Sequence, residues 1–429
     1  MSERIRPRTW VLVLVVAAAM RIAWAAFVPV VPTSDCYVYD GAAQRLAQGL
    51  PYTIDAASTS KSAHWPVGTA FMYSLLYRVF DPATSGHAAA VALNILISLG
   101  VVALTMAAAA RWFGVKAGTA AGVAMACWPM HIQFTTVIAS EPVFTACMLG
   151  GVLLWPRPPN RADARAAHSG RQGGSREIPK LVGSGLLFGL ATLMRPTALL
   201  FPIVLAGIDF LRTRRLVWPA IHAAAATAVL LAVLSPWTIR NYREFGRVVL
   251  VSTNGGANMW MGNNPDTTGH YQLPPPMRPD QNEAEWDKDL GEQAKAYIKQ
   301  QPGAFVKRTL IKAVRLHDRE TIGVAWNLEG LKRASSFFDT GPGASALKAI
   351  SSAYWYLMLA LGGVGAVVVA RRDGLWAMIT HPTVVFFAYF TAVHAIMVIQ
   401  DRYHYPITPM VASLAAVAIV AIRDRRVQA

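Results

Sequence analysis

The sequence predicts an all-α polytopic membrane protein with about ten transmembrane helices. Of its 429 residues, 54% are hydrophobic and 15% are charged, whereas a soluble protein of this size carries about 25% charged residues. Ten apolar runs match the roughly 20 helical residues that cross a bilayer core, although the shorter runs need their flanks or a tilt. Basic residues cluster in alternate loops between the runs, as is typical of membrane proteins.

The predicted spans follow one another along the chain: Trp10–Val30, Ala88–Ala110, Ala117–Val137, Val143–Trp155, Leu181–Met194, Pro196–Phe210, Val217–Trp237, Ile350–Ala370, Gly374–Ile399 and Pro406–Ile422. The first run also has features of a cleaved signal peptide, because basic residues precede it and small residues end it. Its apolar core is longer than the roughly 7–15 residues usual for signal peptides. We therefore expect a retained membrane helix.

The basic loops indicate one orientation. If the N-terminus is cytoplasmic, every short basic cluster falls on the cytoplasmic side, in agreement with the positive-inside rule. These clusters hold Arg111 and Lys116, Arg212 to Arg215, Arg371 and Arg372, and Arg423 to Arg426. Topology and attraction to anionic lipids account for much of the formal charge of +16. The charge therefore requires no nucleic-acid partner.

Two polar segments divide the sequence into three parts. The N-terminal membrane domain (1–239) contains a first external loop (31–87) and a cytoplasmic linker (156–180) rich in Pro, Gly, Ser and Arg. An external domain (240–347) has turns over Asn254–Pro276 and helical patterns over Glu283–Gln301 and Phe305–Leu316. C-terminal membrane helices occupy 348–429. The three cysteines have no spacing typical of a disulfide framework or a metal site.

Several charged residues lie at the predicted outer ends of the spans, where arginine is otherwise depleted. Ionisable groups beside spans are costly and often mark function. They are Asp35 after the first span, Glu141 at the start of the fourth, Arg195 between the fifth and sixth, Arg240 after the seventh, and Asp401 and Arg402 between the ninth and tenth. We expect these side chains to share one face of the protein.

Each of these residues also has a purely structural interpretation. Asp35 could cap a helix over Tyr37–Gln48, whose apolar side suits a helix lying on the bilayer surface. Asp40 could lie on the polar side of that helix. Glu141 could be a first-turn acid favoured by the helix dipole. The remaining residues could anchor span ends at the head groups or in the aromatic belt: Arg195, Arg240, Arg402 and Tyr403.

Six segments, found in order along nearly the whole chain, carry a resemblance to a known family. They are SDCYVYDGAAQRLAQGLPY, HWPVGTAFMYSLLYRVF, SEPVF, GLATLMRPTALL, SPWTIRNYREFGRVVLVSTNGGANMWMGNNPDTTGHY and DRYHYPITPMVASLAAVAI. Together they resemble the C-type (GT-C) glycosyltransferases, especially bacterial relatives of the dolichyl-phosphate-mannose protein mannosyltransferases and the lipid A aminoarabinose transferases. The set is specific to the superfamily and not to a substrate. One departure is Trp65–Pro66, where relatives often have two prolines.

The resemblance implies a GT-C-type fold and a hexosyl- or pentosyltransferase that moves a sugar from a polyprenyl-phosphate carrier to an acceptor. Asp35 matches the catalytic acidic residue in the first loop of such enzymes. A carboxylate there can act as general base on a weak hydroxyl nucleophile, and Asp40 and Glu141 are secondary candidates. Arginine binds phosphate through paired hydrogen bonds, so the candidates for the donor phosphate are Arg195, Arg240 and Arg402.

The loop TNGGANMWMGNNPDTTG is either purely structural, since Gly and Asn favour turns, or it contacts the sugar or the acceptor. The candidates for substrate contact are Trp260, Asn263, Asn264 and His270, together with His64 and Tyr403. A divalent metal ion, Mg²⁺ or Mn²⁺, could bind through Asp35, Glu141 or His270, but no ligand spacing indicates one.

The expected partners are the polyprenyl-phosphate donor, membrane lipids and a lipid, glycan or protein acceptor. The expected location is the cytoplasmic (inner) membrane, with the active site on the periplasmic or extracellular side. Two alternatives stay open: a transporter or flippase for a lipid-linked sugar, and a polymerase or ligase that uses diphosphate-linked oligosaccharides. The transporter is less favoured, because the sequence shows no paired halves with broken helices.

Overall fold

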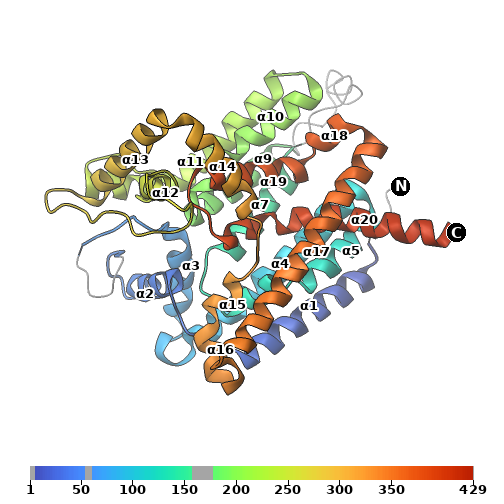
Figure 1. The fold of residues 1–429 in the computed structure, drawn as a ribbon, viewed down its shortest axis with the longest axis horizontal. Helices are drawn as coiled ribbons and strands as arrows, with labels where there is room; N and C mark the ends of the chain where they lie inside the picture. Colours follow the sequence, from blue (N-terminus) through green and yellow to red (C-terminus); the bar gives the residue numbers. More distant parts are fainter. Residues whose placement is uncertain (1–4, 54–59, 157–176, 429) are drawn as a thin grey trace.

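The computed structural model describes residues 5–53, 60–156 and 177–428, and the side chains as far as residue 424 (Figure 1). Every regular element in these ranges is helical, which confirms the predicted all-α class. The cytoplasmic linker predicted over 156–180 lies mostly outside the described residues.

Among the described residues, seven helical stretches are long and apolar enough to cross a bilayer. They are α1 (Pro7–Phe27), Pro82–Phe113 with η1 (Pro82–Gly86) and α4 (His87–Phe113), α9 (Glu177–Met194), Pro196–Thr213 with α10 (Phe201–Thr213), α11 (Val217–Phe245), α17 (Gly341–Asp373), and Asp401–Asp424 with η6 (Asp401–Ile407) and most of α20 (Thr408–Gln428). All seven overlap predicted spans, and the protein is a multi-pass membrane protein.

Three shorter apolar helices accompany them, namely α3 (Val67–Tyr77), α7 (Glu141–Leu154) and α19 (Pro382–Ile396). α7 and α19 correspond to predicted spans. α3 lies in the region predicted to be an external loop, so the sequence analysis missed this helix. Its eleven residues are fewer than the roughly 17–25 that suggest a span.

The prediction of one continuous span over Ala117–Val137 is wrong. α5 (Val115–Ala126) ends before Trp128, and the short α6 (Pro129–Gln133) follows it. Proline has no N–H for the helical ladder, and it disfavours helical geometry in the residue before it. Pro382 has the same effect within the predicted span Gly374–Ile399, because it separates α18 (Leu375–Ile379) from α19.

The loops predicted to share the cytoplasmic side meet at one end of the bundle. Lys116, before α5, forms an ion pair of 2.9 Å with Asp424 at the end of α20. Arg212 Nε, at the end of α10, donates to Thr380 Oγ1 at 3.2 Å. The end of α20 lies on the opposite side of the molecule from α2 (Asp35–Ala47) and α12 (Gly255–Gly262) in Figure 1.

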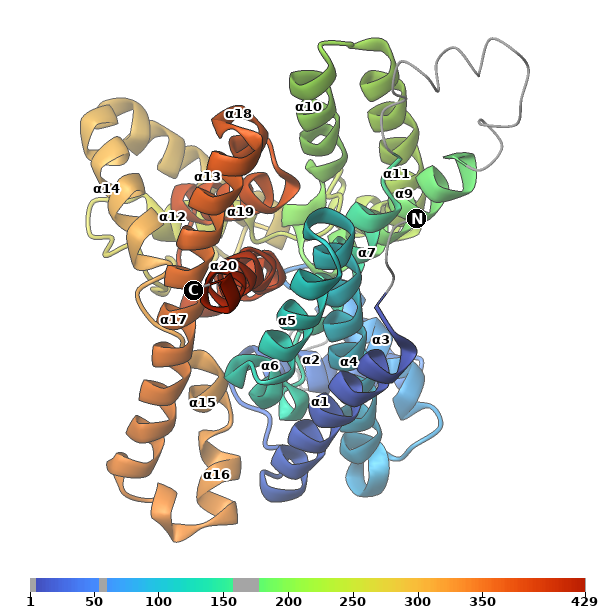
Figure 2. The same ribbon diagram turned by 90° about the vertical axis from the view of Figure 1, so that its right-hand side faces the viewer.

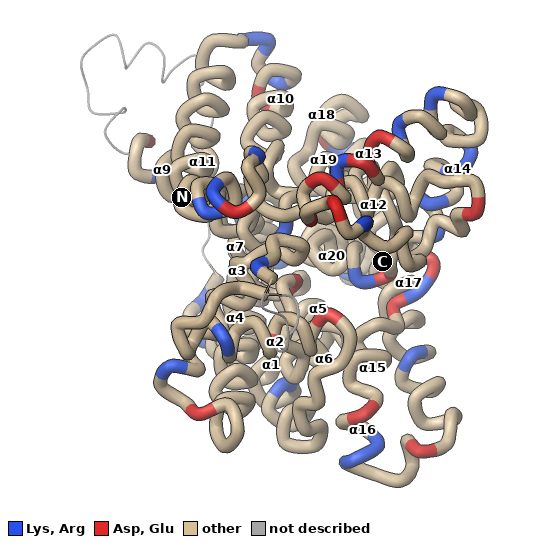
Figure 3. The backbone as a smooth tube through the Cα atoms, turned by 90° about the vertical axis from the view of Figure 1, so that its left-hand side faces the viewer, with Lys and Arg blue, Asp and Glu red and all other residues tan. Residues whose placement is uncertain are grey.

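Part of the predicted external domain lies at that opposite side, where α12, α13 (Glu283–Gln300) and α14 (Pro302–Arg315) pack in sequence. α15 (Ile322–Trp326) and α16 (Leu328–Ala334) lie apart from them, and α15 contacts α6 and α17 (Figure 1). Asn282 caps α13 with a capping box: its Oδ1 accepts from the Glu285 N–H, and Glu285 Oε2 accepts from the Asn282 N–H. The two helices predicted here therefore form, and charged residues are frequent on α13 and α14 (Figure 3).

Small residues let the membrane helices approach closely. α17 packs against α20 (Figure 2), and a Cβ atom on Gly365 would lie 1.9 Å from the Leu414 carbonyl oxygen. Glycine is therefore required at this crossing. This packing holds η6, which precedes α20 directly, against the rest of the bundle.

Candidate active site

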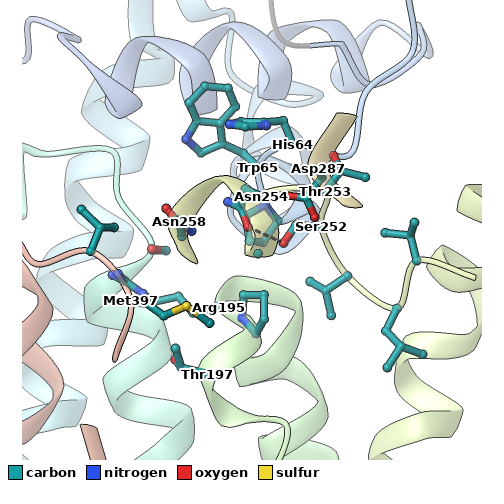
Figure 4. Close-up of a pocket in the computed structure, with 18 of the residues that line it drawn as sticks. His64, Trp65, Arg195, Thr197, Ser252, Thr253, Asn254, Asn258, Asp287 and Met397 are labelled. Atoms are coloured by element: carbon teal, nitrogen blue, oxygen red, sulfur yellow. Dashed lines mark hydrogen bonds between the residues drawn. The ribbon is translucent and has the colours of Figure 1, made fainter. Parts of the chain in front are cut away.

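A cavity of about 1040 Å³ lies at the end of the bundle opposite the basic loops. Its walls come from the start of α2, the loop before α3, the loop after α9, the segment from the end of α11 into α12, part of α13, and the segment between α19 and η6. Figure 4 shows part of this wall, with His64 and Trp65 facing Arg195 and Met397 across the space. Segments far apart in the sequence therefore meet around one space.

Two carboxylates and two arginines form a charge cluster at one side of the cavity, with Asp35, Arg195 and Arg402 at its wall and Glu141 behind them. Arg402 Nη2 donates to Asp35 Oδ2 at 2.7 Å, and Arg402 Nη1 lies 3.5 Å from Glu141 Oε1. Arg195 Nη1 lies 2.7 Å from the same Glu141 oxygen. Glu141 is fully buried, so the two arginines compensate a charge that could not be buried alone. The two negative charges of Asp35 and Glu141 are thus balanced by the two positive charges of Arg195 and Arg402.

Arg402 is held from several sides. Its Nε donates to Gln400 Oε1 at 2.6 Å, and its guanidinium lies over the rings of Trp326 and Tyr403. Arg195 lies over the ring of Tyr403 as well, at 5.1 Å from its centroid. The aromatic rings provide cation–π stabilisation without neutralising the charge. The ring contacts therefore help to hold both guanidinium groups at the cavity wall.

Asp401 fixes the segment that carries Arg402. Its Oδ2 accepts from the backbone N–H of Thr321 at 2.7 Å, from the Thr321 hydroxyl at 2.8 Å and from the Ile322 N–H at 3.1 Å. Its Oδ1 accepts from the Arg402 N–H. Asp401 is thus occupied with the start of α15, and it positions η6.

Asp35 is not a helix cap, so that interpretation of the sequence is wrong. α2 begins at Asp35 itself, and the capping position belongs to Ser34, whose side chain makes no capping hydrogen bond. Ser34 has φ 54°, a left-handed conformation that turns the chain sharply. The Asp35 carboxylate instead lines the cavity and reaches Arg402.

The apolar side of α2 packs inside the protein. Tyr39, Ala42 and Ala43 are buried in the main hydrophobic core, so this side of the helix does not lie on the bilayer surface. Asp40 is also buried, and the expectation that it lies on an exposed polar side is wrong. It accepts from the Tyr77 hydroxyl at 2.6 Å and from Gln44 Nε2 at 2.9 Å. Asp40 is not among the residues that line the cavity.

Arg240 is not part of the charge cluster. Its Nη1 donates to the Ser62 carbonyl at 2.8 Å and to Asn241 Oδ1 at 3.0 Å, and its guanidinium lies over the Trp237 ring. It is not among the residues that line the cavity. Arg240 therefore holds the loop before α3 against the end of α11.

The predicted Asn/Gly loop mainly supports its own backbone. Asn263 Nδ2 donates to the carbonyls of Met259 and Ile396 at 2.9 and 2.8 Å, and Asn264 Nδ2 donates to the Trp260 carbonyl at 2.8 Å. None of Trp260, Asn263, Asn264 and His270 is among the residues that line the cavity. These contacts favour the structural interpretation of the four residues.

The far wall of the cavity combines aromatic and polar side chains. His64 packs edge-on against Trp65, with ring centroids 4.5 Å apart, and burial lowers the pKa of its imidazole. Asp287 of α13 accepts from the Ala257 N–H at 2.9 Å, and burial raises its pKa to about 6. Asn258 projects from α12, and Asn254 projects from the position directly before this helix (Figure 4). Such a wall can contact sugar hydroxyl groups and ring faces.

Several residues that line the cavity were not predicted from the sequence. His394 stacks on Tyr403 with centroids 4.4 Å apart, and Gln400, Asn258 and Asp287 also line the cavity. Gln400 lies two residues before Arg402, so its position in the sequence could have indicated that it belongs to the same site. Asn258 lies in the Asn/Gly loop that was singled out, although other residues of that loop were named. His394 and Asp287 lie within ordinary helical patterns, where nothing in the sequence distinguishes them.

The described residues do not form the divalent-metal site that the sequence left open. Asp35 and Glu141 are each paired with an arginine, and His270 is not among the cavity residues. Within residues 5–53, 60–156 and 177–428 no group of three His, Cys, Asp or Glu side chains is placed to hold a metal ion. A cation would also be repelled by Arg195 and Arg402.

Neither family models nor curated proteins match the sequence significantly. Among solved structures, the archaeal oligosaccharyltransferase AglB from Archaeoglobus fulgidus, in complex with an inhibitory peptide and a dolichol-phosphate, aligns over 97% of this chain with a TM-score of 0.59 and 11% identity. The apo form of the Archaeoglobus fulgidus oligosaccharyltransferase aligns over 97% with a TM-score of 0.58 and 12% identity.

This chain spans about half the length of those proteins, since the two alignments cover 50% and 51% of their chains. ArnT from Cupriavidus metallidurans bound to undecaprenyl phosphate aligns over 94% of this chain, with 16% identity and a TM-score of 0.45. That score is too low to support a conclusion. The similarity to the oligosaccharyltransferase shows that the chain has the GT-C fold.

Proposed function

We propose that this protein is a membrane glycosyltransferase that moves a sugar from a polyprenyl-phosphate donor to an acceptor. The observation that carries the proposal is the cluster of Asp35, Glu141, Arg195 and Arg402 at the wall of a large cavity within a GT-C fold. The oligosaccharyltransferase with this fold was solved with a dolichol-phosphate. A lipid phosphate of this class is the donor chemistry that the two arginines suit.

The donor phosphate would bind to Arg195 and Arg402. A polyprenyl tail partitions into lipid, so its phosphate lies at head-group depth, at the same level as the span ends that carry these residues. Guanidinium groups donate paired hydrogen bonds to phosphate oxygens. The buried Glu141 holds both arginines from behind, and it fixes their geometry before the donor arrives. Preorganised cations stabilise the charge that develops on the leaving phosphate.

Donor binding would also release Asp35. In the empty site Arg402 Nη2 donates to Asp35 Oδ2, and this is the group that a phosphate oxygen would engage. The freed carboxylate then accepts the proton of the acceptor hydroxyl while that oxygen attacks the anomeric carbon. The bond between the anomeric carbon and the phosphate oxygen breaks, and polyprenyl phosphate leaves with the electron pair.

The remaining residue assignments follow their position. His64 and Tyr403 line the cavity, and we assign them to contact with the sugar or the acceptor. We assign residues 31–87 as the catalytic first external loop. The external domain 240–347 forms the far wall of the cavity, between membrane domains 1–239 and 348–429. The distribution of the basic loops supports a location of the cavity on the periplasmic or extracellular side of the cytoplasmic membrane.

A transfer assay tests the proposal. Wild-type and Asp35→Asn protein are expressed in a strain that lacks this gene, and its membranes receive polyprenyl phosphate carrying a labelled hexose or pentose. We expect label to move to a membrane glycan, lipid or protein with the wild type alone. Transfer from diphosphate-linked oligosaccharides only would identify a polymerase or ligase. Movement of intact donor between leaflets, without transfer, would identify a flippase.

A further inference from the structure

α14 presents an unpartnered apolar stripe at the edge of the external domain. Val306, Leu310 and Val314 follow one another at a spacing of four residues and are 55%, 64% and 73% exposed. Residues four apart lie on the same side of a helix, so the three side chains form a continuous surface. Val11 and Leu12 of the membrane-spanning α1 have similar exposures of 61% and 65%. A water-facing helix would not normally keep such a stripe.

The charge of α14 is entirely basic. Lys307, Arg308, Lys312 and Arg315 lie within Pro302–Arg315, and the helix contains no acidic residue. Lys307 and Arg315 are exposed, and each follows a stripe residue directly in the sequence. Figure 3 shows the basic positions of α14 at the periphery of the molecule. An apolar stripe flanked by Lys and Arg is the pattern of helices that lie in the surface of anionic bilayers.

The contacts of α14 place it at the membrane surface. Lys312 Nζ donates to the carbonyls of Met397 and Ile396 at 2.7 and 3.3 Å, at the outer end of α19. Five residues later along the chain, His317 Nε2 lies 3.0 Å from Thr391 Oγ1 within α19. Thr391 lies about 7.5 Å further along the α19 axis than Ile396, at 1.5 Å per residue, in the direction of the cytoplasmic end. The C-terminal end of α14 therefore lies beside the membrane helix α19.

The chain just after α14 contacts a membrane-spanning helix that has exposed apolar side chains of its own. The Tyr356 hydroxyl of α17 donates to the Asp318 carbonyl just after α14, and Leu357 beside it is 54% exposed on that membrane-spanning helix. We propose that α14 lies in the outer surface of the membrane, with Val306, Leu310 and Val314 in the lipid and Lys307 and Arg315 at anionic phospholipid head groups.

The arrangement links the membrane surface to the cavity. Lys312 points away from the stripe, and its Nζ also donates to the Gly262 carbonyl at the end of α12. Met397, whose carbonyl it binds, lines the cavity. A lipid-anchored α14 therefore holds one side of the cavity rim at a fixed depth. The proposal does not depend on the reaction catalysed in the cavity.

Spin labelling of the full chain in nanodiscs tests this placement without any activity assay. Leu310→Cys carries the label, Lys295→Cys on α13 is the matched exposed control, and wild type treated with the same reagent gives the background from its native cysteines. We expect position 310 to be relaxed by dissolved oxygen and protected from a water-soluble nickel complex, with the opposite order at position 295. Val306→Cys repeats the measurement if Leu310→Cys does not fold.

Two results would overturn the proposal. Equal nickel access at positions 310 and 295 would mean that the stripe faces water. Protection from both reagents at 310 would mean that a second copy or another protein covers it. The double variant Lys307→Gln/Arg315→Gln tests the role of lipid charge. When phosphatidylglycerol replaces phosphatidylcholine, the label at position 310 should move deeper in the protein that keeps both cations. This shift should vanish in the double variant. An equal shift in both would exclude a role for these cations.

Discussion

Asp35 has two properties that suit a general base, a position beside the proposed phosphate-binding arginine and access to the cavity. Its Oδ2 is bound by Arg402 at 2.7 Å, and its side chain is 22% exposed. No hydrogen bond among the described residues reaches Oδ1, which leaves this oxygen available for an acceptor hydroxyl. The helix that follows does not use the carboxylate as a cap.

The substitution Asp35→Asn separates catalysis from structure. The amide keeps the shape of the side chain, and α2 needs no cap from it, so the thermal midpoint and donor binding should change little. An amide cannot take the acceptor proton, and we expect sugar transfer to fall by roughly 10²-fold or more. Transfer rates, differential scanning fluorimetry and donor binding measure the three quantities. A fully active variant would leave Glu141 as the nearest carboxylate for the role.

Arg402 and Arg240 provide a matched pair of arginines for testing the phosphate assignment. Arg402 lines the cavity, and Arg240 binds the Ser62 carbonyl outside it. Charge-assisted hydrogen bonds contribute about 1.5–3 kcal/mol, so Arg402→Ala should weaken donor binding by roughly 10- to 150-fold. Arg402→Lys should recover only part, because the planar fork is lost.

Arg240→Ala should lower the thermal midpoint while the donor affinity of the folded fraction stays close to that of the wild type. Equilibrium binding of a polyprenyl phosphate to the purified variants makes the comparison. If Arg240→Ala loses affinity as strongly as Arg402→Ala, Arg240 belongs to the phosphate site, as the sequence alone suggested.

At the scale of elements, the junction of α12 and α13 controls the far wall of the cavity. The Asp287 carboxylate accepts the Ala257 N–H in the first turn of α12. A Cβ atom on Gly256 would lie 1.7 Å from the Asp287 carbonyl oxygen, so the two helices touch backbone to backbone. Ionisation of Asp287 in this partly buried contact is unfavourable, and its pKa rises to about 6.

This contact predicts a pH dependence of stability. Between pH 4 and pH 6 the folded protein keeps the Asp287 proton while the unfolded chain, with an ordinary pKa near 3.8, has lost it. The stability that Asp287 contributes therefore falls as the pH rises through this window. Asp287→Asn should remove the effect, so it should gain on the order of 1–2 kcal/mol relative to wild type between pH 4 and 7. Chemical denaturation of both proteins at pH 4 and at pH 7 measures the difference, and parallel changes in the two proteins would show that Asp287 titrates normally.

At the scale of the whole molecule, the charges separate into two ends. The basic loops meet where Lys116 pairs with Asp424, and the mixed cluster of Asp35, Glu141, Arg195 and Arg402 lies at the other end. The bias of Lys and Arg towards short cytoplasmic loops sets which end faces inward. The cavity should therefore open outside the cytoplasm.

Cysteine accessibility in intact cells checks this orientation. A membrane-impermeant maleimide should label Asp280→Cys before α13 and leave Arg215→Cys after α10 unlabelled until the cells are broken. Both positions are exposed, so the difference reports the membrane side and not burial. Unmodified protein supplies the background of the native cysteines. The reverse labelling pattern would place the cavity in the cytoplasm and exclude an external reaction.

The sequence by itself determined the all-α class of fold, the seven long apolar helices and the positions of α13 and α14 in the chain. Long apolar runs have to leave water, and the bilayer thickness fixes their length, so these properties follow from local composition. Pro129 and Pro382 were visible in the sequence too, but hydropathy alone did not show that they interrupt helices. The short α3 was missed for a related reason, since a helix packed inside the protein need not match the bilayer.

Only the tertiary structure decided which charged residues meet. Asp35 and Arg402 are 367 positions apart in the chain, yet they form a hydrogen bond of 2.7 Å. Arg240, at an equivalent span end, instead reaches a carbonyl outside the cavity. Hydrophobic burial in the bilayer sets the depth of a residue one helix at a time. The direction in which that residue points around the bundle depends on how all the helices pack against one another. The residues that determine this packing are spread over the whole chain.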